Sequence, residues 1–383
     1  MAVHTGDLVD TLARIASHER RSLKLVVASK RFMGTDDFAG VMNTLGKDCY
    51  VFSDIENGPS IRSCQSAIDT ALEVAPDFMV AIGGGSVLDT AKVMRIALYR
   101  GESQIEELLG NLKPVVIGPK ARFVAVPTTH GTGSEVTKWA TVWDKNNKRK
   151  HSISDPDNYP DDAIYDARLC ESLPVELSLA SAMDALSHAL EAIWNKNENE
   201  RSDELAISGI GLIVPALDSL SEPVDLDVRR QLLLGSRLAG LAFSNTSTAA
   251  AHSISYPLTA HFGIPHGIAC SMPLRPLMEI NGSSVRSKLD RLSSHLGVAG
   301  ADELWPWVER ALAGKVRFRL REYGVARSDL PRLQHVYVLH LHLHAPVARV
   351  VEGIVQLGRK EAGRAVKAVA AAADVQVARA QRE

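Results

Sequence analysis

The spacing of apolar positions changes part-way along the chain. Over about the first 170 residues, short apolar runs alternate with stretches of helical periodicity. Such alternation is typical of parallel α/β structure. The pattern predicts strands at residues 23–27, 50–52, 78–82 and 122–126, and a helix at residues 87–98. We therefore expect an N-terminal α/β domain with a parallel sheet.

Beyond Pro174 the pattern is helical almost throughout. Helices are predicted at residues 176–194, 202–217 and 228–243, with almost no strand signal. We place the boundary at residue 173, which gives an α/β domain at residues 1–173 and an all-α C-terminal domain at residues 174–383. The last part, residues 331–383, is atypical. It is rich in Arg, Ala and Val, and its HLHLH run at residues 340–344 predicts either a short strand or no native element.

Charge and hydrophobicity narrow the class of partners. The chain has 43 Lys and Arg against 45 Asp and Glu, a formal net charge of -2. This balance argues against nucleic acid and anionic membrane surfaces as main partners. The N-terminus lacks the pattern of a secretory signal, and no apolar run approaches the roughly 20 residues that span a bilayer. We expect a cytoplasmic protein.

The cysteines exclude further classes. Cys49, Cys64, Cys170 and Cys270 are scattered and form no C-x-x-C pair. The pattern therefore argues against a disulfide framework, a thiolate zinc site and thioredoxin-type redox chemistry.

The segment GGGSVLDTAK, residues 83–92, follows a predicted strand and begins a predicted helix. Glycines without Cβ atoms let a phosphate approach the backbone, and the helix N-terminus favours its negative charge. The segment is neither G-x-G-x-x-G nor a P-loop. The competing interpretation is a plain tight turn between strand and helix.

A second loop, PTTHGTGSE at residues 127–135, follows the next predicted strand. Thr128, Thr129, Thr132 and Ser134 offer hydroxyls to phosphate or ribose oxygens. Ligands of open parallel sheets bind at the carboxyl ends of the strands, where these two loops are expected. Hydroxyl residues are also common in loops that bind nothing.

Acidic and imidazole side chains recur in the helical half. Asp184 and His188 are four residues apart in a predicted helix, so they point from one face. His252, His261 and His266 lie within fifteen residues of one another. An Asp with several His could hold a divalent cation as a Lewis acid, and iron or zinc suits that shell better than magnesium. The alternative is a set of structural histidines.

These motifs, together with DALSHALEA and H-x13-H-G, closely resemble the iron-dependent (group III) alcohol dehydrogenases from about residue 20 to about residue 285. The resemblance implies an N-terminal NAD(P)-binding domain, a helical C-terminal domain, an active site between them and a homodimer. It implies Fe²⁺, or Zn²⁺, bound by Asp184, His188, His252 and His266, with His261 outside the set. It implies cofactor contacts at Gly84, Gly85, Ser86, Asp89, Thr128, Thr129, Ser134, Thr137 and Lys150.

Two substitutions depart from the family pattern. Ser29 stands where the family commonly has an acidic residue, and Lys30 and Arg31 follow it. An acid there would hold the ribose and repel a 2′-phosphate, so Ser29 predicts tolerance of NADPH beside NADH. Alternatively, the basic residues are simply solvated. Tyr256 replaces a His that many members carry, and its phenol could donate a proton or bind a substrate oxygen. The last ~50 residues do not resemble the family's tail, which suggests a diverged ending or a reading-frame error.

Within the family, the stretches around Asp184 and around His266 look most similar to phosphonoacetaldehyde reductases of phosphonate antibiotic biosynthesis. The expected reaction is metal-dependent reduction of a small aldehyde by NAD(P)H to a primary alcohol, here phosphonoacetaldehyde to 2-hydroxyethylphosphonate. Lys138, His151 and Tyr256 are candidate donors to the dianion.

Three alternatives remain open. One is a general short-chain alcohol dehydrogenase of the same family. Another is a sugar-phosphate cyclase related to dehydroquinate synthase, whose metal set resembles Glu-His-His. The third is a non-catalytic nucleotide-binding or scaffold protein with the same fold.

Overall fold

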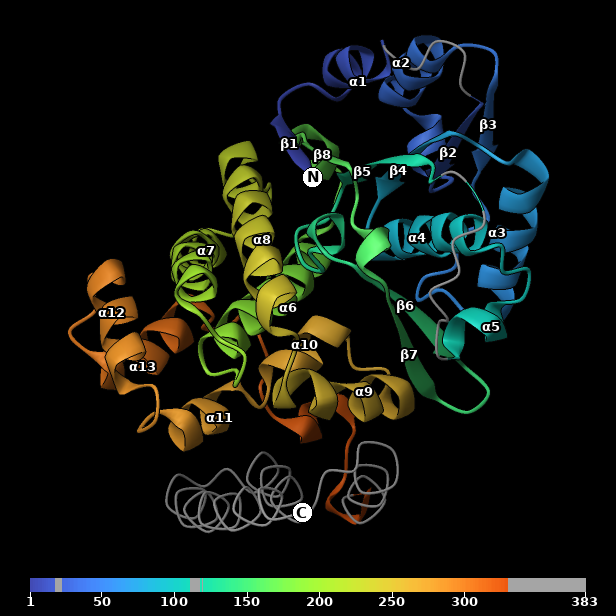
Figure 1. Cartoon of the computed structure of the whole chain (residues 1–383). Coiled ribbons are helices and arrows are strands. Elements are labelled where there is room, and N and C mark those ends of the chain that lie inside the picture. Colours follow the sequence, from blue (N-terminus) through green and yellow to red (C-terminus); the bar gives the residue numbers. More distant parts are fainter. Residues whose placement is uncertain (18–22, 111–117, 119, 330–383) are drawn as a thin grey trace.

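A computed structural model describes residues 1–17, 23–110, 118 and 120–329 (Figure 1). The predicted atypical tail, with its HLHLH run, lies outside the described residues. The described part begins with an α/β region and continues as a region built from helices.

Six parallel strands form the main sheet, in the order β1-β8-β5-β4-β2-β3. Their bounds are Ala2–Thr5 (β1), Lys24–Ala28 (β2), Cys49–Phe52 (β3), Phe78–Gly83 (β4), Arg122–Pro127 (β5) and Asp162–Tyr165 (β8). The four predicted strands correspond to β2, β3, β4 and β5. The sequence pattern missed β1 and β8, which are four residues each and pair with each other from opposite ends of the region.

Both faces of the sheet are covered by helices, because apolar residues follow one another without polar gaps along its central strands. On β2, Leu25 and Val27 pack under α3 (Ile61–Val74) and α4 (Gly85–Arg100). Val26 and Ala28 face α1 (Leu8–Ala16) and α2 (Asp36–Leu45) on the other side. Within this sheet, β4 and β5 pair in register from Phe78 with Arg122 to Gly83 with Pro127, so their carboxyl ends lie beside each other.

A short helix and a hairpin complete the α/β region. The helix is α5 (Ile105–Leu109), and the hairpin consists of β6 (Trp139–Asp144) and β7 (Arg149–Ser154), paired antiparallel. Strand β7 contacts a helix of the second region, α9. The hairpin therefore links the sheet to the helical region (Figure 1).

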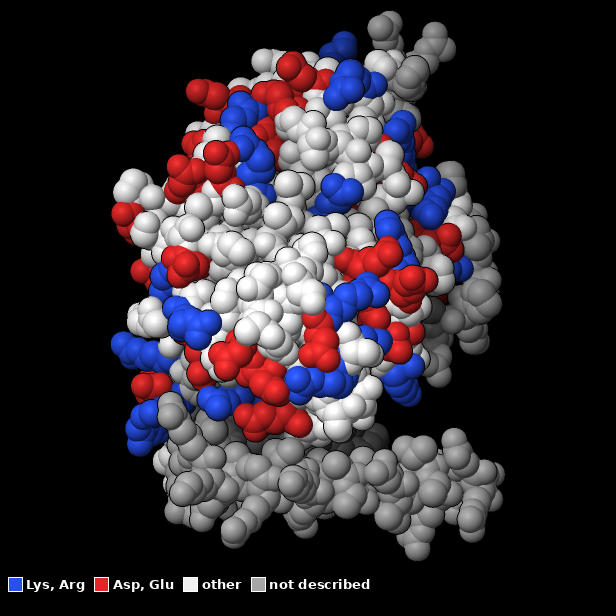
Figure 2. Space-filling model, turned by 90° about the vertical axis from the view of Figure 1, so that its left-hand side faces the viewer, with Lys and Arg blue, Asp and Glu red and all other residues white. Residues whose placement is uncertain are grey.

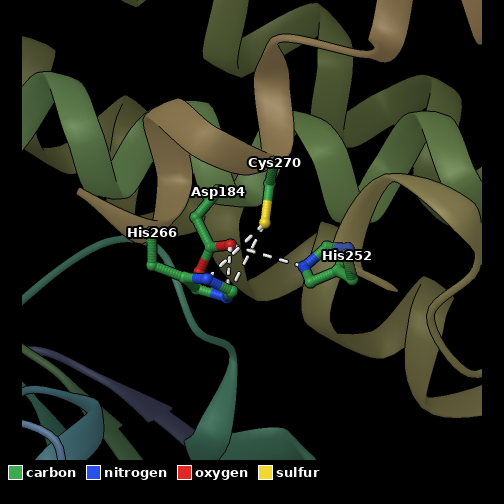
Figure 3. Close-up of side chains that lie close together, drawn as sticks. All are labelled: Asp184, His252, His266 and Cys270. Atoms are coloured by element: carbon green, nitrogen blue, oxygen red, sulfur yellow. Dashed lines mark hydrogen bonds and ion pairs between the residues drawn. The ribbon is translucent and has the colours of Figure 1, made fainter. Parts of the chain in front are cut away.

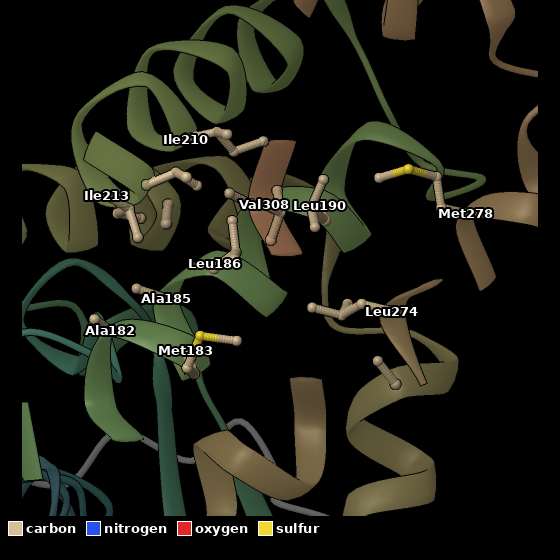
Figure 4. Packing of buried hydrophobic residues seen from close by; sticks show 14 of the residues in the cluster. Ala182, Met183, Ala185, Leu186, Leu190, Ile210, Ile213, Leu274, Met278 and Val308 are labelled. Carbon is tan, nitrogen blue, oxygen red and sulfur yellow. The ribbon is translucent and has the colours of Figure 1, made fainter. Parts of the chain in front are cut away.

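The helical region is built around α6. Its helices are Val175–Ile193 (α6), Glu200–Asp218 (α7), Leu226–Thr246 (α8), Ala250–Phe262 (α9), His266–Ser271 (α10), Leu274–Asn281 (α11), Arg286–Leu296 (α12) and Ala301–Ala311 (α13). Figure 4 shows Leu186 and Leu190 of α6 in the apolar core with Ile210 and Ile213 of α7 and Val308 of α13. Residues 182–193 of α6 are all buried, so the polar residues among them lie inside the protein.

The predicted fold class, an α/β region with a parallel sheet followed by an all-α region, is confirmed. The predicted helices correspond to α4, α6, α7 and α8, with ends that agree to within three residues. The expected boundary at residue 173 falls between the last strand, β8, and the first long helix, α6.

The surface carries mixed charge. On the face shown in Figure 2, acidic and basic side chains of the described residues are interspersed around uncharged areas. This mixture agrees with the small net charge. No helix among the described residues is long and apolar enough to cross a membrane.

Candidate functional site

The glycine loop, residues 83–85, joins β4 to α4 in close contact with the neighbouring loop. A Cβ atom on Gly84 would lie 3.1 Å from Thr129 Cγ2, and one on Gly85 would lie 2.6 Å from Thr132 Cγ2. Gly84 is the N-cap of α4, and no side chain caps this helix. Its first N–H groups are therefore available to an anion, as at other phosphate-binding helix starts. The structure brings the two predicted loops together at the carboxyl edge of the sheet.

The second loop, which we name the threonine loop (residues 128–138), is braced by polar contacts with α4. Ser134 Oγ donates to Asp89 Oδ1 at 2.6 Å, and the backbone N–H of Thr141 donates to Asp89 Oδ2 at 2.9 Å. Burial raises the pKa of Asp89, although the ammonium of Lys92 works in the opposite direction. Lys92, itself fully buried, donates to the carbonyl oxygen of Thr137 at 2.7 Å. Asp89, Ser134 and Thr137 thus use their polar atoms to shape the loop.

Two further predicted cofactor residues also have protein partners. Ser86 Oγ accepts from the N–H of Gly58 at 3.0 Å. Ser29, at the end of β2, accepts from the N–H of Phe32 at 3.3 Å. Thr128 and Thr129 are half-buried beside the glycine loop, where the N–H of Thr128 donates to the Gly83 carbonyl at 3.0 Å.

A cluster of possible metal ligands lies in the helical region. We name it the cation cluster: Asp184 from α6, His252 from α9, and His266 and Cys270 from α10 (Figure 3). One ligand atom from each residue lies within 4.8 Å of the others. His252 Nε2 is 3.4 Å and His266 Nε2 is 3.8 Å from Asp184 Oδ1.

Hydrogen bonds outside the cluster orient its imidazoles. His252 Nδ1 is 2.6 Å from Oε2 of Glu191, a fully buried carboxylate that also accepts from the N–H of Ala249 at 2.9 Å. The hydroxyl of Ser255 donates to the His252 carbonyl, so it can accept from His266 Nδ1 at 3.3 Å. When each ring donates its Nδ1–H outward, the Nε2 lone pair faces the cluster, which is the arrangement usual for metal-binding histidines.

Two atoms at the centre have no hydrogen-bond partner. Asp184 Oδ1 and His252 Nε2 are both buried, and neither makes a hydrogen bond. Leaving a buried polar group unpaired costs about 1–3 kcal/mol, and more when it is charged. A divalent cation would satisfy both atoms, and imidazole and carboxylate donors suit a d-block ion. The residues present therefore fit the predicted metal.

Neighbouring groups also shift the pKa values of Asp184 and Cys270 in the direction that favours metal binding. Burial acts to raise the pKa of Asp184, but the imidazoles of His188, His252 and His266 hold it well below its usual range. For the Cys270 thiol, burial also acts upwards, yet His252 and His266 lower its pKa to about 7. The cluster thus favours a carboxylate and a readily ionised thiol, the forms that bind metals.

His188 lies beside the cluster. Its ring stacks on His252 at a centroid distance of 4.4 Å and on Phe243 at 4.0 Å, and its Nδ1 is buried without a hydrogen-bond partner. Burial lowers the pKa of this imidazole to about 3, so it is neutral. Phe243 stacks in turn on Trp139 at 5.5 Å. A column of four rings therefore connects the start of the hairpin with the cluster.

Tyr256 and Lys150 lie against each other next to His266. The Tyr256 ring stacks on His266 at 5.9 Å, and Lys150 Nζ, from β7, lies 4.3 Å from the centre of the Tyr256 ring. Burial acts to lower the pKa of Lys150, but Tyr256, Cys270 and Asp184 together raise it, so its ammonium is favoured. Lys138 instead lies 5.5 Å from the Trp139 ring centre.

Cys270 could not be recognised as a candidate ligand from the sequence. The lack of a C-x-x-C pair argues against a site built from thiolates, but it says nothing about a single thiolate among histidines. The available signal was its spacing, because Cys270 follows His266 by four residues and thus lies one helical turn away. The structure does bring His252 and His266 together, as the sequence pattern predicts.

A parallel sheet that ends in glycine and threonine loops, followed by a helical region with a carboxylate–imidazole cluster, defines a candidate nucleotide- and cation-dependent enzyme. Residues 3–167 match the family model "Iron-containing alcohol dehydrogenase", and residues 178–362 match "Fe-containing alcohol dehydrogenase family, C-terminal". The chain belongs to this family of oxidoreductases. The second match reaches residue 362, so it includes part of the segment expected to differ from the family's tail.

Named relatives agree with this assignment. The NADPH-dependent butanol dehydrogenase of Clostridium saccharobutylicum is 30% identical over 308 residues, which cover 78% of this chain and 79% of that protein. The lactaldehyde reductase of Escherichia coli (strain K12) is 29% identical over 301 residues, covering 76% and 78%.

A solved structure of a sulfoacetaldehyde reductase from Bifidobacterium kashiwanohense, in complex with NAD⁺, superimposes with a TM-score of 0.81 at 25% identity. The match covers 88% of this chain and 90% of that one. The expected pairing of a nicotinamide cofactor with iron agrees with this relative and with the family's description. The family also favours a dehydrogenase over the cyclase and scaffold alternatives.

Proposed function

We propose that this chain is a metal-dependent NAD(P)H oxidoreductase that reduces a small anionic aldehyde to a primary alcohol. The observation that carries the proposal is the cation cluster, with two buried, unpartnered ligand atoms, joined by a column of rings to the hairpin that follows the threonine loop. A cation site next to loops suited to a nucleotide supports metal-assisted reduction of a carbonyl by a nicotinamide.

A bound divalent cation supplies a Lewis acid for the aldehyde oxygen, and NAD(P)H supplies the hydride. Asp184, His252 and His266, with His188 as the other expected ligand, would hold the cation. Glu191 keeps Nε2 of His252 directed inward by accepting the proton on Nδ1. Tyr256 Oη, on the ring stacked against His266, is assigned to hold the substrate oxygen or to donate the proton that completes the alcohol.

The nucleotide is assigned to the glycine and threonine loops. Gly84 and Gly85 leave room for the pyrophosphate at the start of α4, and Thr128 and Thr129 offer hydroxyls beside it. Asp89, Ser134 and Thr137 support this surface from behind. Ser29 leaves space near the ribose for NADPH as well as NADH.

We propose phosphonoacetaldehyde as the substrate and 2-hydroxyethylphosphonate as the product, as expected for phosphonate antibiotic biosynthesis. Support comes from Lys150 and Tyr256, which place an ammonium and a phenol beside the cluster. The relative that is described as a sulfoacetaldehyde reductase acts on a two-carbon aldehyde with a tetrahedral anionic group. A phosphonate has the same shape and more charge, so it needs donors of this kind.

We further propose a separate role for each domain, a homodimer and a cytoplasmic location. Residues 1–173 would bind the nucleotide and residues 174–383 the cation, in a homodimer. All four cysteines are free, which supports a reducing, cytoplasmic compartment.

The test is an assay of NADH and NADPH oxidation by the protein loaded with Fe²⁺ or Zn²⁺. Phosphonoacetaldehyde, sulfoacetaldehyde, propanal and glycolaldehyde are compared as substrates. A strong preference for phosphonoacetaldehyde supports the full proposal. Better turnover of propanal retains the oxidoreductase and overturns the anionic substrate, and no turnover of any aldehyde overturns the proposed reaction.

The variant Lys150→Gln separates two roles for this residue. If Lys150 binds the substrate anion, KM rises for phosphonoacetaldehyde by roughly tenfold, about 1.4 kcal/mol, while KM for propanal is unchanged. If Lys150 instead contacts the nucleotide, as the family resemblance implies, KM for NAD(P)H rises with both aldehydes.

A further inference from the structure

The thiol of Cys270 occupies the position of a fourth ligand in the cation cluster. Its Sγ atom lies 3.7 Å from His266 Nε2, and Cys270 is fully buried. Figure 3 shows the sulfur directed toward the Asp184 carboxylate and the His266 ring. The position of Cys270 is therefore set by the same geometry that gathers the carboxylate and the imidazoles.

Direct backbone packing holds this thiol in place. A Cβ atom on Gly267 would lie 1.9 Å from the Ala180 carbonyl oxygen and 2.8 Å from the backbone nitrogen of Asp184. Helix α10 thus rests on α6 at the residue that carries the carboxylate. Because Cys270 is one turn after His266 on this helix, both of their side chains extend from the side that meets Asp184.

The unpartnered atoms are the second observation. Asp184 Oδ1 and His252 Nε2, both more than nine-tenths buried, are aimed into the space that Cys270 also faces. A thiol that served only to fill the core would be expected among apolar atoms. Cys270 instead lies where three other donors converge.

We propose that the Cys270 thiolate is a ligand of the same cation that Asp184, His252 and His266 bind. This inference rests on the proposed function, because it assumes that the cluster holds a cation. A thiolate softens the shell, so the site should prefer Zn²⁺ to Fe²⁺ more strongly than a shell of oxygen and nitrogen donors would. His188, whose ring stacks on His252 and Phe243, remains the other expected ligand.

The experiment uses the full chain, stripped of metal and reloaded with Co²⁺, whose absorption spectrum reports sulfur ligands. The wild type is compared with Cys270→Ser and Cys270→Ala. The control is Cys170→Ser, since Cys170 is also fully buried but packs in a separate apolar cluster with Tyr165 and Leu233. Cobalt content, circular dichroism and aldehyde reduction are measured on every sample.

We expect a thiolate-to-cobalt charge-transfer band in the wild type and in Cys170→Ser, and its loss in both Cys270 variants. Zinc affinity should fall by at least roughly tenfold in Cys270→Ser, because even outer-shell partners contribute 10–100-fold. In competition, its ratio of bound zinc to bound iron should fall as well.

Stoichiometric cobalt without that band in the wild type overturns the inference, and so does a band that survives in Cys270→Ser. If such a sample still reduces aldehydes, the proposed function stands without the thiolate ligand. If the folded wild type binds no cobalt, zinc or iron, both the inference and the metal-dependent function are overturned.

Discussion

The two candidate binding regions satisfy their polar groups in opposite ways. In the α/β region, Asp89, Ser134 and Lys92 use their polar atoms on neighbouring protein groups, so the loops hold their shape before any ligand arrives. In the helical region, Asp184 Oδ1 and His252 Nε2 are buried 3.4 Å from each other, and neither makes a hydrogen bond. The first region offers a nucleotide the backbone N–H groups at the start of α4 and a surface whose shape is already fixed. The second presents buried donor atoms that a cation would satisfy.

This difference predicts different responses to substitution. Substitutions at the cation cluster should alter metal content and the free energy of unfolding together, because a bound cation would interact with the buried donor atoms that lack hydrogen bonds. Changes at the glycine loop should alter nucleotide binding and leave metal content unchanged.

Gly267→Ala should disrupt the cation cluster as a whole. The new Cβ would collide with backbone atoms of α6, which cannot move aside as a flexible side chain could. We expect a loss of about 3 kcal/mol in the free energy of unfolding, at the upper end for overpacking, together with loss of the bound metal. Denaturant unfolding and metal analysis measure both effects.

Gly300→Ala is the matched control, because a Cβ at that position meets nothing within 4 Å. Normal metal content in Gly267→Ala would show that α10 need not rest on α6, and the packing argument would fail.

His266→Ala should abolish stable metal binding and activity while the fold is retained. The variant removes a ligand, so metal affinity should fall by more than the roughly 10–100-fold that is typical of an outer-shell partner. Metal content after gel filtration and the rate of NADH oxidation provide the measurements. His261→Ala, outside the cluster, should keep both. Full metal content in His266→Ala would mean that the ligand assignment is wrong.

Gly85→Ala should weaken nucleotide binding alone. Its Cβ would push against the Thr132 side chain and narrow the start of α4. We expect KM for NADH to rise roughly tenfold, about 1.4 kcal/mol, with unchanged metal content. Adding Thr132→Ser removes the Cγ2 atom at 2.6 Å and should recover part of the loss. A fall in metal content in the single variant would break the separation between the two regions.

Ser29→Asp should have the smallest effect, limited to the choice of cofactor. A carboxylate at the end of β2 would hold ribose hydroxyls and repel a 2′-phosphate. The ratio of kcat/KM for NADPH to that for NADH should fall roughly tenfold, about 1.4 kcal/mol. An unchanged ratio would remove the argument that Ser29 permits NADPH.

Much of the fold could be predicted from the sequence because its signals are local. Strands β2 to β5 are mainly apolar runs, and α6 to α8 show long helical periodicity. Each of these elements can therefore be recognised from a short stretch of sequence. Strands β1 and β8 could not be recognised in this way. Each has only four residues, and their pairing joins positions 2–5 with positions 162–165.

In the candidate site too, residues with a local sequence pattern could be predicted, and residues that act through long-range contacts could not. Asp184 and His188 share a helix face, and the pair His252 and His266 follows a recognisable motif. The roles of Asp89 and Ser134 as braces were not visible, since that hydrogen bond joins α4 to a different loop. Glu191, which orients His252 from another helix, gave no signal for a similar reason.

By itself, the sequence determined the two kinds of structure, the order of the two loops and the residues able to bind a cation, because these depend on side-chain chemistry and short-range periodicity. Only the tertiary structure decided which of those residues meet. The packing of α10 on α6 through Gly267 brings Cys270 to Asp184, and the stacked rings place His188 beside His252. Convergence of this kind depends on contacts between helices far apart in the chain, and no local pattern records those contacts.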